Sequence, residues 1–451
     1  MQIDPPASPR SRLPLILIIV ALGLIITGGA ALMVWQLGQL NPPPKVAATP
    51  APIDPTAPIE AAPGSGAHNR LAVIDGARLY TIDPDGKNQN VIEPRGEVPI
   101  GALIWTHDGK RLVYAQTVGP DSQLISTGPD GSDERVLFQS DRVKVPFYLN
   151  GAPDDGHIAF LIADTVRGLD LQVAALGQAD SAHSVTKGQP NYASWSPDGQ
   201  ALLLHVGGTA SEAFIGTYRL GDDQPTAIET SPAEFQAPLW ATTDQRLYAQ
   251  RGSAQSSLIG ETGGKQQTLA TFDNGITFSG SPDGEFVAYA LNTPTSFLYE
   301  TLTVMKRDGT QARVIERGDV LAFFWSPDGH KLAHLVGTFV SPGSVGRAGG
   351  LAAPSRQTGR TLQLTWHVID VVTGEHQILT TFEPNASFLY LIQYFDQFAQ
   401  SIAVWSPDSR SLVYTGTPFG GSPGVYVVDT QAAQPQGVYV GSGDFAIWSW
   451  R

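Results

Sequence analysis

The sequence of 451 residues contains no cysteine. This absence excludes a disulfide framework, a thiolate metal site and a cysteine nucleophile, so stability must come from packing and backbone pairing. Charged residues are also scarce, at 16%, and the basic ones are fewest, with 28 Lys and Arg against 42 Asp and Glu. The resulting net charge of −14 argues against a nucleic-acid partner, because phosphate binding requires a basic face.

Glycine and proline are in excess. The chain contains 48 Gly and 34 Pro, about 18% of its residues, whereas average proteins contain roughly 12% of the two together. Both residues punctuate turns and are disfavoured inside helices, so this composition favours a turn-rich, all-β protein.

One long hydrophobic run, Leu13–Trp35, has 23 consecutive residues without a charge and predicts a single transmembrane helix. A cleaved signal peptide, followed by secretion, is the alternative, because residues 28–31 are small enough for a cleavage site. Arg10 and Arg12 precede the run, and the next basic residue is Lys45. This bias predicts a cytoplasmic tail over residues 1–12, an anchor in the cytoplasmic membrane, and the bulk of the chain outside.

Residues 36–69 form a predicted Pro/Ala-rich linker. Eight prolines lie between Asn41 and Asn69, and large apolar side chains are almost absent. Such a segment cannot bury enough surface to fold, and its prolines stiffen it into an extended spacer. The remaining residues, 70–451, are expected to form one extracytoplasmic domain.

A short pattern recurs through residues 70–451: an apolar strand ending in Trp, then Ser-Pro-Asp-Gly, then another apolar strand. In such a turn the Ser side chain accepts a backbone N–H, and Pro fixes φ at the next position. Asp tolerates the third position, and Gly adopts backbone angles that other residues disfavour. The preceding Trp offers a large apolar surface that can pack against a neighbouring repeat. We assign this structural role to Trp105, Trp195, Pro197, Asp198, Pro282, Asp283, Trp325, Pro327, Asp328, Trp405, Pro407 and Asp408.

The spacing of the repeats predicts a β-propeller. The first strands end near residues 105, 151, 195, 240, 280, 325, 405 and 448, and a second Gly turn in each repeat adds two more strands. Repeats of about 40–45 residues with four strands are typical of propeller blades. Residues 70–95 lack a first strand and the C-terminus supplies one, so we expect eight blades closed by pairing of the chain's ends. Seven blades is the alternative, if the degenerate copy near Asp154 is not a blade.

The Trp-Ser-Pro-Asp-Gly turns, and the second turn at Asp83-Pro84-Asp85-Gly86, resemble the WD40-like propeller repeats of the TolB type. This resemblance covers essentially all of residues 70–451 and implies a bacterial cell-envelope protein. It is nearly silent about function, because such repeats occur both in a periplasmic partner-binding protein and in propellers that gate hydrolases. We expect no counterpart of TolB's small α/β domain in this sequence and no hydrolase domain after the propeller.

Two insertions interrupt the repeats within the 80-residue interval, and both are expected on the face formed by the connections between second and third strands and between successive blades. The first covers residues 338–360 and the second residues 383–400, with the connection 416–424 beside them. The aromatic residues of the second favour an interface, or alternatively a local cap over the channel. The candidate interaction surface comprises Phe388, Leu389, Tyr390, Tyr394, Phe395, Phe398, Arg347, Arg356 and Arg360. The three arginines of the first insertion suit an anionic ligand or partner, and the alternative is that this insertion is a mobile surface loop.

No catalytic residue, metal ligand or cofactor site is predicted. Residues 420–424 spell G-x-S-x-G, but Pro423 removes an N–H that an oxyanion would need, so we interpret them as a turn. His330 and His334 lack the Glu of a zinc-peptidase helix and lie in a predicted strand, and the other histidines occur singly. Asn385-Ala386-Ser387 matches a glycosylation sequon that chance also explains.

The predicted function is therefore that of a non-catalytic propeller, tethered to the membrane by its N-terminal helix. It is expected to bind a protein or envelope ligand on the face that carries the insertions. The alternative is a hydrolase or lyase acting on an envelope peptide or glycan in the central channel. The predicted channel-facing strands, such as residues 191–195 and 321–325, are almost wholly apolar, which favours the first hypothesis.

Overall fold

The computed structural model describes residues 69–98, 102–141, 144–164, 168–228, 230–292, 298–340 and 361–451. The predicted tail, membrane helix and nearly all of the linker lie outside these residues. In the part of the chain that is described, no helix is both long and apolar enough to cross a membrane.

The described strands pair antiparallel throughout, in five four-stranded sheets and one ten-stranded sheet. This confirms the all-β prediction for these residues, with two short helices as exceptions. The first sheet has the order β3-β2-β1-β30 and contains β1 (Leu71–Asp75), β2 (Arg78–Ile82), β3 (Asn90–Ile92) and β30 (Phe445–Trp448). The second contains β4 (Leu103–Trp105), β5 (Leu112–Val118), β6 (Asp121–Thr127) and β7 (Arg135–Asp141).

The next three sheets follow in chain order. The third contains β8 (Phe147–Gly151), β9 (His157–Asp164), β10 (Gly168–Ala175) and β11 (His183–Gly188). The fourth contains β12 (Asn191–Trp195), β13 (Ala201–Val206), β14 (Phe214–Arg219) and β15 (Thr226–Ala227). The fifth contains β16 (Leu239–Trp240), β17 (Gln245–Gln250), β18 (Ser256–Thr262) and β19 (Lys265–Phe272).

The ten-stranded sheet is built from three successive groups of strands. The first is β20 (Ile276–Gly280), β21 (Phe286–Leu291), β22 (Tyr299–Lys306) and the first half of β23 (Arg313–Trp325). The second half of β23 pairs with β24 (Lys331–Val340), followed by β25 (Thr361–Asp370) and β26 (His376–Pro384). The third is β27 (Ser411–Pro418), β28 (Gly424–Asp429) and β29 (Gly437–Gly441), joined to β26 only at its end.

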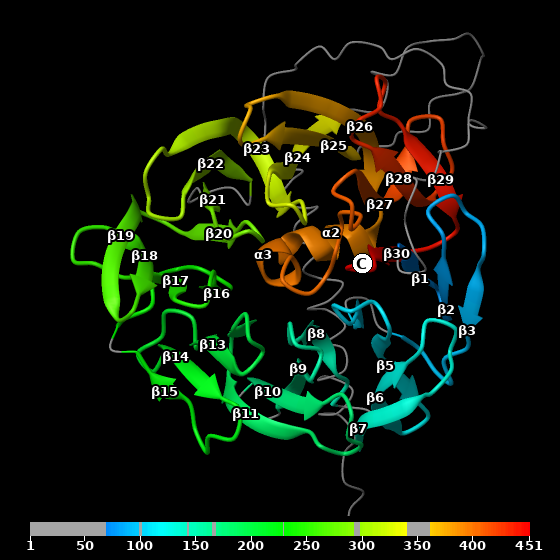
Figure 1. Cartoon of the computed structure of the whole chain (residues 1–451), viewed down its shortest axis with the longest axis horizontal. Helices are drawn as coiled ribbons and strands as arrows, with labels where there is room; N and C mark the ends of the chain where they lie inside the picture. The colour runs from blue at the N-terminus through cyan, green and yellow to red at the C-terminus, as the bar shows by residue number, and fades with distance from the viewer. Residues whose placement is uncertain are drawn as a thin grey trace, which may run out of the picture. The chain divides into compact units, whose positions relative to one another are not determined.

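The sheets contact one another in cyclic order, and their first strands lie nearest a common centre (Figure 1). β4 contacts β8, β12 contacts β16, and β27 contacts β30. The first sheet joins the two ends of the domain, because β1 pairs with β30: Leu71 lies opposite Trp448 and Ile74 opposite Phe445. The predicted pairing of the C-terminal strand with the N-terminal strands is therefore confirmed, and it removes the open edge that either end would present alone.

The repeated turn has the hydrogen bonds expected from its residues. Ser196 Oγ donates to Asp198 Oδ1 (2.5 Å) and accepts from the N–H of Ala201 (2.9 Å). Gly199 adopts a φ of +70°, and Ser409 stands at the equivalent position with a φ of +58°. The same Ser-to-Asp bond recurs from Ser326 to Asp328 and from Ser406 to Asp408, each at 2.5 Å.

The tryptophan of the motif links successive groups of strands through its indole N–H. Each donor reaches a carbonyl oxygen on the first strand of the preceding group: Trp195 to Asn150 (2.9 Å), Trp325 to Ser279 (3.4 Å) and Trp405 to Phe324 (3.0 Å). Trp105 is also buried. In Trp195, Trp325 and Trp405 the motif thus supplies a directional hydrogen bond between successive groups of strands, in addition to the packing surface that the sequence predicts.

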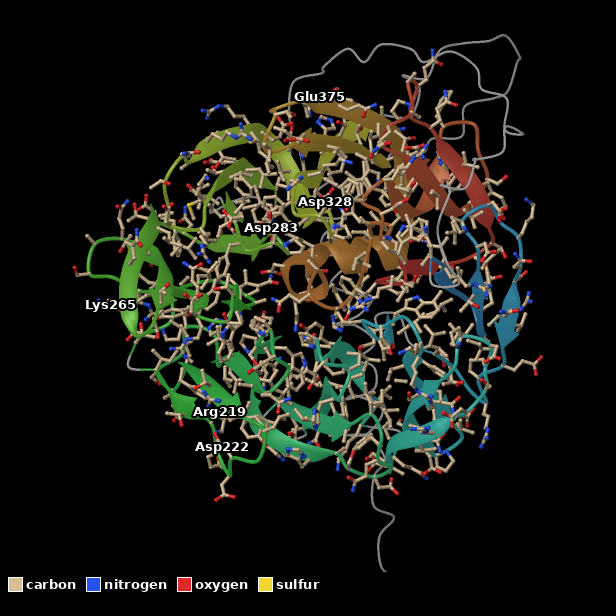
Figure 2. The ribbon with its side chains drawn as sticks, viewed as in Figure 1. Arg219, Asp222, Lys265, Asp283, Asp328 and Glu375 are labelled. Atoms are coloured by element: carbon tan, nitrogen blue, oxygen red, sulfur yellow. The ribbon has the colours of Figure 1, made fainter. Side chains whose placement is uncertain are left out.

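Side chains labelled in Figure 2 show the two radial positions of the turns. Asp283 and Asp328 belong to the repeated turns and lie nearer the centre. Lys265 and Glu375 belong to the hairpins between third and fourth strands and lie at the rim.

Replacing Gly329 by Ala tests how tightly the repeated turns pack on one another. At a φ of +76° an alanine is strained by roughly 1–2 kcal/mol. Its Cβ would also lie 2.5 Å from Cγ of Asp283, whose carboxylate accepts hydrogen bonds in the neighbouring turn. We expect Gly329→Ala to lower the free energy of unfolding, measured in urea, by roughly 1 kcal/mol more than the control.

The matched control is Gly263→Ala. Gly263 has a φ of +56°, and an added Cβ would meet no atom within 4 Å. Equal losses in the two variants would show that the contact between turns contributes nothing beyond backbone strain.

Candidate functional site

The segment after β26 forms two short helices at the centre of the domain, α2 (Ala386–Gln393) and α3 (Phe395–Phe398) (Figure 1). The sequence predicts an insertion here but no helix. α2 begins at Asn385, whose side-chain oxygen accepts the N–H of Phe388 (2.9 Å) as an N-cap. Apolar residues then recur at three- and four-residue spacing, which places Phe388, Leu391 and Ile392 on one buried face.

Asn385 also fixes the helix to two other parts of the domain. Its amide Nδ2 donates to the carbonyl of Asp444 (2.8 Å), just before β30. Its Oδ1 accepts from Oγ1 of Thr415 on β27 (3.1 Å). The amide of the sequon is therefore committed to structural hydrogen bonds, which disfavours a glycan at this asparagine.

The helices pack on the inner strands of sheets from opposite sides of the centre. Phe395 contacts Phe323 of β23 with ring centroids 4.7 Å apart, and Tyr299 of β22 at 6.1 Å. Phe398 contacts Tyr148 of β8 at 5.6 Å. Each is an edge-to-face contact of the kind that adds to the free energy of apolar burial. The space where the inner strands converge is therefore filled by residues of the same chain.

The predicted surface residues of this segment are mostly interior. Phe388, Leu389, Phe395 and Phe398 have exposed fractions of 3%, 8%, 1% and 2%. This burial agrees with the alternative of a local cap. It leaves these four side chains almost no exposed surface on which a partner could bind. Tyr390 and Tyr394 are half-buried and keep part of their surface in solvent. The other candidates, Arg347, Arg356 and Arg360, lie outside the described residues.

Asp396 is a charged side chain at this centre, and it is 3% exposed. Its Oδ1 accepts the N–H of Gln397 (3.0 Å), and its Oδ2 lies 3.5 Å from the N–H of Ala237. Burial raises the pKa of Asp396 to about 6, despite the lowering effect of Thr277 and these N–H groups. Burial first, and then the Asp396 charge, also raise the pKa of Tyr148. A buried carboxyl with a raised pKa is a candidate acid or base, although here it is enclosed.

A second cluster of titratable residues lies on four consecutive strands. Glu316 of β23, His334 of β24, His367 of β25 and His376 of β26 have ligand atoms that all lie within 4.8 Å of one another. Nε2 of His334 is 3.3 Å, and Nδ1 of His367 is 3.4 Å, from Oε2 of Glu316. These are the described residues that could hold a metal ion.

The prediction that the histidines other than His330 and His334 occur singly is wrong, because the fold brings His367 and His376 next to His334. His334 does lie in a strand, as predicted, while His330 is exposed in the preceding turn. His334 and His367 are direct cross-strand partners, and His376 on the next strand lies opposite Ile369, two residue pairs further along. Aligning the second, third and fourth strands of this repeat would have revealed the convergence.

The electrostatics of the cluster follow from burial. Burial lowers the pKa of His334, and it lowers the pKa of His367 to about 4 with help from the charge of His334. The hydrogen bond from His334 is the largest cause that lowers the pKa of Glu316 to about 2. At neutral pH the cluster therefore holds a carboxylate and at least two neutral imidazoles.

The G-x-S-x-G look-alike lies in the connection between β27 and β28. Gly421 donates its N–H to the carbonyl of Pro418 (2.9 Å), and the carbonyl of Ser422 accepts from the Tyr426 hydroxyl (2.6 Å). The segment joins two strands, so it has none of the strand-to-helix geometry of a nucleophile elbow. Phe419 in this connection is 70% exposed.

No family model matches the chain, and no curated protein matches it. Among solved structures, TolB from Acinetobacter baumannii is 17% identical with a TM-score of 0.33, over 55% of this chain and 64% of that one. The chain thus spans less than two thirds of that TolB. A putative TolB from Agrobacterium tumefaciens is 13% identical with a TM-score of 0.36, over 70% and 90%. An oligogalacturonate lyase in complex with manganese is 14% identical with a TM-score of 0.41, over 82% and 83%. These likenesses assign no activity to the chain.

Removing the cap of α2 tests its anchoring. Asn385→Ala loses the acceptor for Phe388 and Thr415 and the donor to Asp444. We expect the free energy of unfolding, measured in urea, to fall by roughly 1–2 kcal/mol. Asn385→Ser keeps a side-chain oxygen for the cap, so its free energy of unfolding should fall by about half as much. Equal stability of the alanine variant and the wild type would contradict the assigned anchoring.

Asp396 gives a pH dependence with a defined sign. Because its folded-state pKa of about 6 exceeds its ordinary value of 3.8, the folded chain keeps a proton that the unfolded chain releases. This contribution to stability is fully present below about pH 4 and is lost as the pH rises through about 6. We therefore expect Asp396→Asn to match the wild type near pH 4 and to exceed it by roughly 2–3 kcal/mol at pH 8.

The measurement is urea unfolding at both pH values, with the exposed Asp223→Asn as the control for loss of a charge. A stability difference for Asp396→Asn that is the same at both pH values would show that this carboxyl is not desolvated.

Proposed function

We propose that this chain is a membrane-tethered, extracytoplasmic β-propeller of eight blades that binds a protein or cell-envelope ligand and performs no catalysis. Five four-stranded sheets and the three groups of the ten-stranded sheet support the blade count. The degenerate repeat near Asp154 connects β8 and β9 of a complete sheet, which supports eight blades over seven. The observation that carries the functional proposal is the filled centre of the domain.

A filled centre disfavours chemistry in the channel. A substrate would have to displace α2 and α3 to reach Asp396, because Phe395 and Phe398 beside it are almost fully buried. The inner strands contribute buried apolar side chains at this point, such as Phe323. Ligand binding is therefore expected on the outside of the domain.

The connections on the face that carries α2 offer the best-supported binding surface. The end of β27 meets the start of α2, because Pro384 pairs with Gly416 and Asn385 bonds to Thr415. The connection that follows β27 presents Phe419, and α2 presents part of Tyr390. Exposed aromatic side chains of this kind are enriched where proteins bind partners.

The charge of the domain bears on the partner. Setting aside the three basic and three acidic residues before residue 70 leaves 25 basic and 39 acidic side chains. This net charge of −14 repels an anionic membrane surface and favours a neutral or basic partner.

The absence of native cysteine allows a single-cysteine test on the full-length chain in the cells that produce it. Phe419→Cys is labelled with a maleimide photo-cross-linker, and the control is Val372→Cys, which is 61% exposed in the hairpin between β25 and β26. We expect a discrete cross-linked product from position 419 and none from position 372. The same products at both positions, or none at position 419, would contradict binding on this face.

Membrane topology is read in the same cells with a membrane-impermeant maleimide. Phe419→Cys should be labelled in intact spheroplasts, whereas Ser8→Cys should be labelled only after lysis. Labelling of Ser8→Cys in intact cells would reverse the proposed orientation.

The second candidate function is a hydrolase or lyase that uses Asp396 after α2 and α3 open. The raised pKa of this carboxyl is the observation that favours it. Turnover of an envelope peptide or glycan that is abolished in Asp396→Asn, while the variant stays folded, would replace the binding proposal.

A further inference from the structure

Glu316, His334, His367 and His376 come from four adjacent strands, β23 to β26, and stand apart from the aromatic centre. Four such donors within 4.8 Å of one another are an unusual convergence for a chain with nine histidines in 451 residues. We propose that these four side chains bind one divalent first-row transition-metal ion, with Zn²⁺ as the expected ion.

The distances suit tetrahedral coordination. Zinc binds imidazole nitrogen and carboxylate oxygen at roughly 2.0–2.2 Å, so neighbouring ligand atoms in a tetrahedron lie about 3.3 Å apart. The distances from Oε2 of Glu316 are 3.3 Å to Nε2 of His334 and 3.4 Å to Nδ1 of His367. These two distances match the spacing of ligand atoms around a tetrahedral ion, and all four ligand atoms lie within 4.8 Å of one another.

The third histidine completes the set. The ring centroids of His334 and His367 are 5.2 Å apart, and that of His376 lies 6.0 Å from the first and 5.2 Å from the second. His376 is exposed, whereas His334 is fully buried. The site therefore has one solvent-facing ligand through which an ion can reach the buried ones.

The donor chemistry selects the class of metal. Three imidazoles and one carboxylate suit Zn²⁺ and its first-row neighbours, whereas Mg²⁺ and Ca²⁺ require mainly oxygen ligands. In the described part of the chain, the ion pairs of Glu316 are with these two histidines and with no lysine or arginine.

The position of the site indicates what the ion would do. Glu316 lies in the half of β23 that pairs with β22, while the three histidines lie on β24, β25 and β26, which follow the other half of β23 in the sheet. A bound ion would therefore fasten the first group of strands, through Glu316, to the three histidine strands of the second group, with four protein ligands and a structural role.

The test uses the full-length chain, purified in detergent, stripped with EDTA and titrated with ZnCl₂ alone. We expect about one Zn²⁺ per chain by elemental analysis and a melting temperature raised by a few degrees. His376→Ala and Glu316→Gln should each weaken zinc binding by at least about tenfold and remove the rise in melting temperature. The matched control, His330→Ala, removes an exposed histidine outside the cluster and should bind zinc as the wild type does.

Binding of Co²⁺ gives a second readout that needs no variant. A tetrahedral site of nitrogen and oxygen ligands produces intense visible absorption, which octahedral surface binding does not. Zinc binding that is equal in the wild type and His376→Ala, or a Co²⁺ spectrum of octahedral type, would overturn the proposal. Failure of cross-linking at position 419 would leave it intact, because the two tests share no residue.

Discussion

The structure depends on filling the space where its innermost strands converge. Sheets arranged about a common centre converge there on their first strands, whose buried side chains include Phe323 and Phe324. α2 and α3 supply further apolar groups, and Phe395 alone contacts rings on β22 and β23. A void at this point would forfeit the dispersion contacts on which close packing depends. The insertion after β26 is therefore part of the core.

The sheets around this centre are held in sequence by one repeated device. Trp195, Trp325 and Trp405 each donate the indole N–H to a carbonyl of the preceding inner strand, whereas the buried indole N–H of Trp105 has no hydrogen-bond partner among the described residues. The turn after it packs on the neighbouring turn, as Gly329 does on Asp283. Pairing of β1 with β30 then makes the last contact equivalent to the others. The hydrogen bonds of the repeated turns and the pairing of β1 with β30 thus together hold the strand groups in their order around the centre.

Much of this architecture could be predicted from the sequence, because the turn residues recur at fixed positions. Trp195, Pro197 and Asp198 mark a hairpin by residue type alone, and the missing first strand at the N-terminus indicates how the ends pair. The burial of Phe388 and Phe395 could not be read in the same way, because an aromatic segment outside the repeat suits a surface and a cap equally well. Only the space that the inner strands leave decides between them.

The histidine cluster shows a different limit of the sequence. His334, His367 and His376 are separated by 33 and 9 positions, so no linear motif joins them. Strand register alone brings them together, since His334 and His367 face each other across β24 and β25. Register depends on where each strand begins, which repeat spacing leaves uncertain by one or two residues and which decides the face of the sheet.

The central claim is that the chain's own segment 385–400 fills the centre of the native domain. Hydrogen–deuterium exchange of the full-length protein tests it most directly, by comparing amides of residues 389–399 with those of the inner half of β23. The account predicts that both segments exchange together and slowly, in the global unfolding event. Exchange of residues 389–399 within seconds, while β23 stays protected, would show a lid that opens on an accessible channel and would contradict the account.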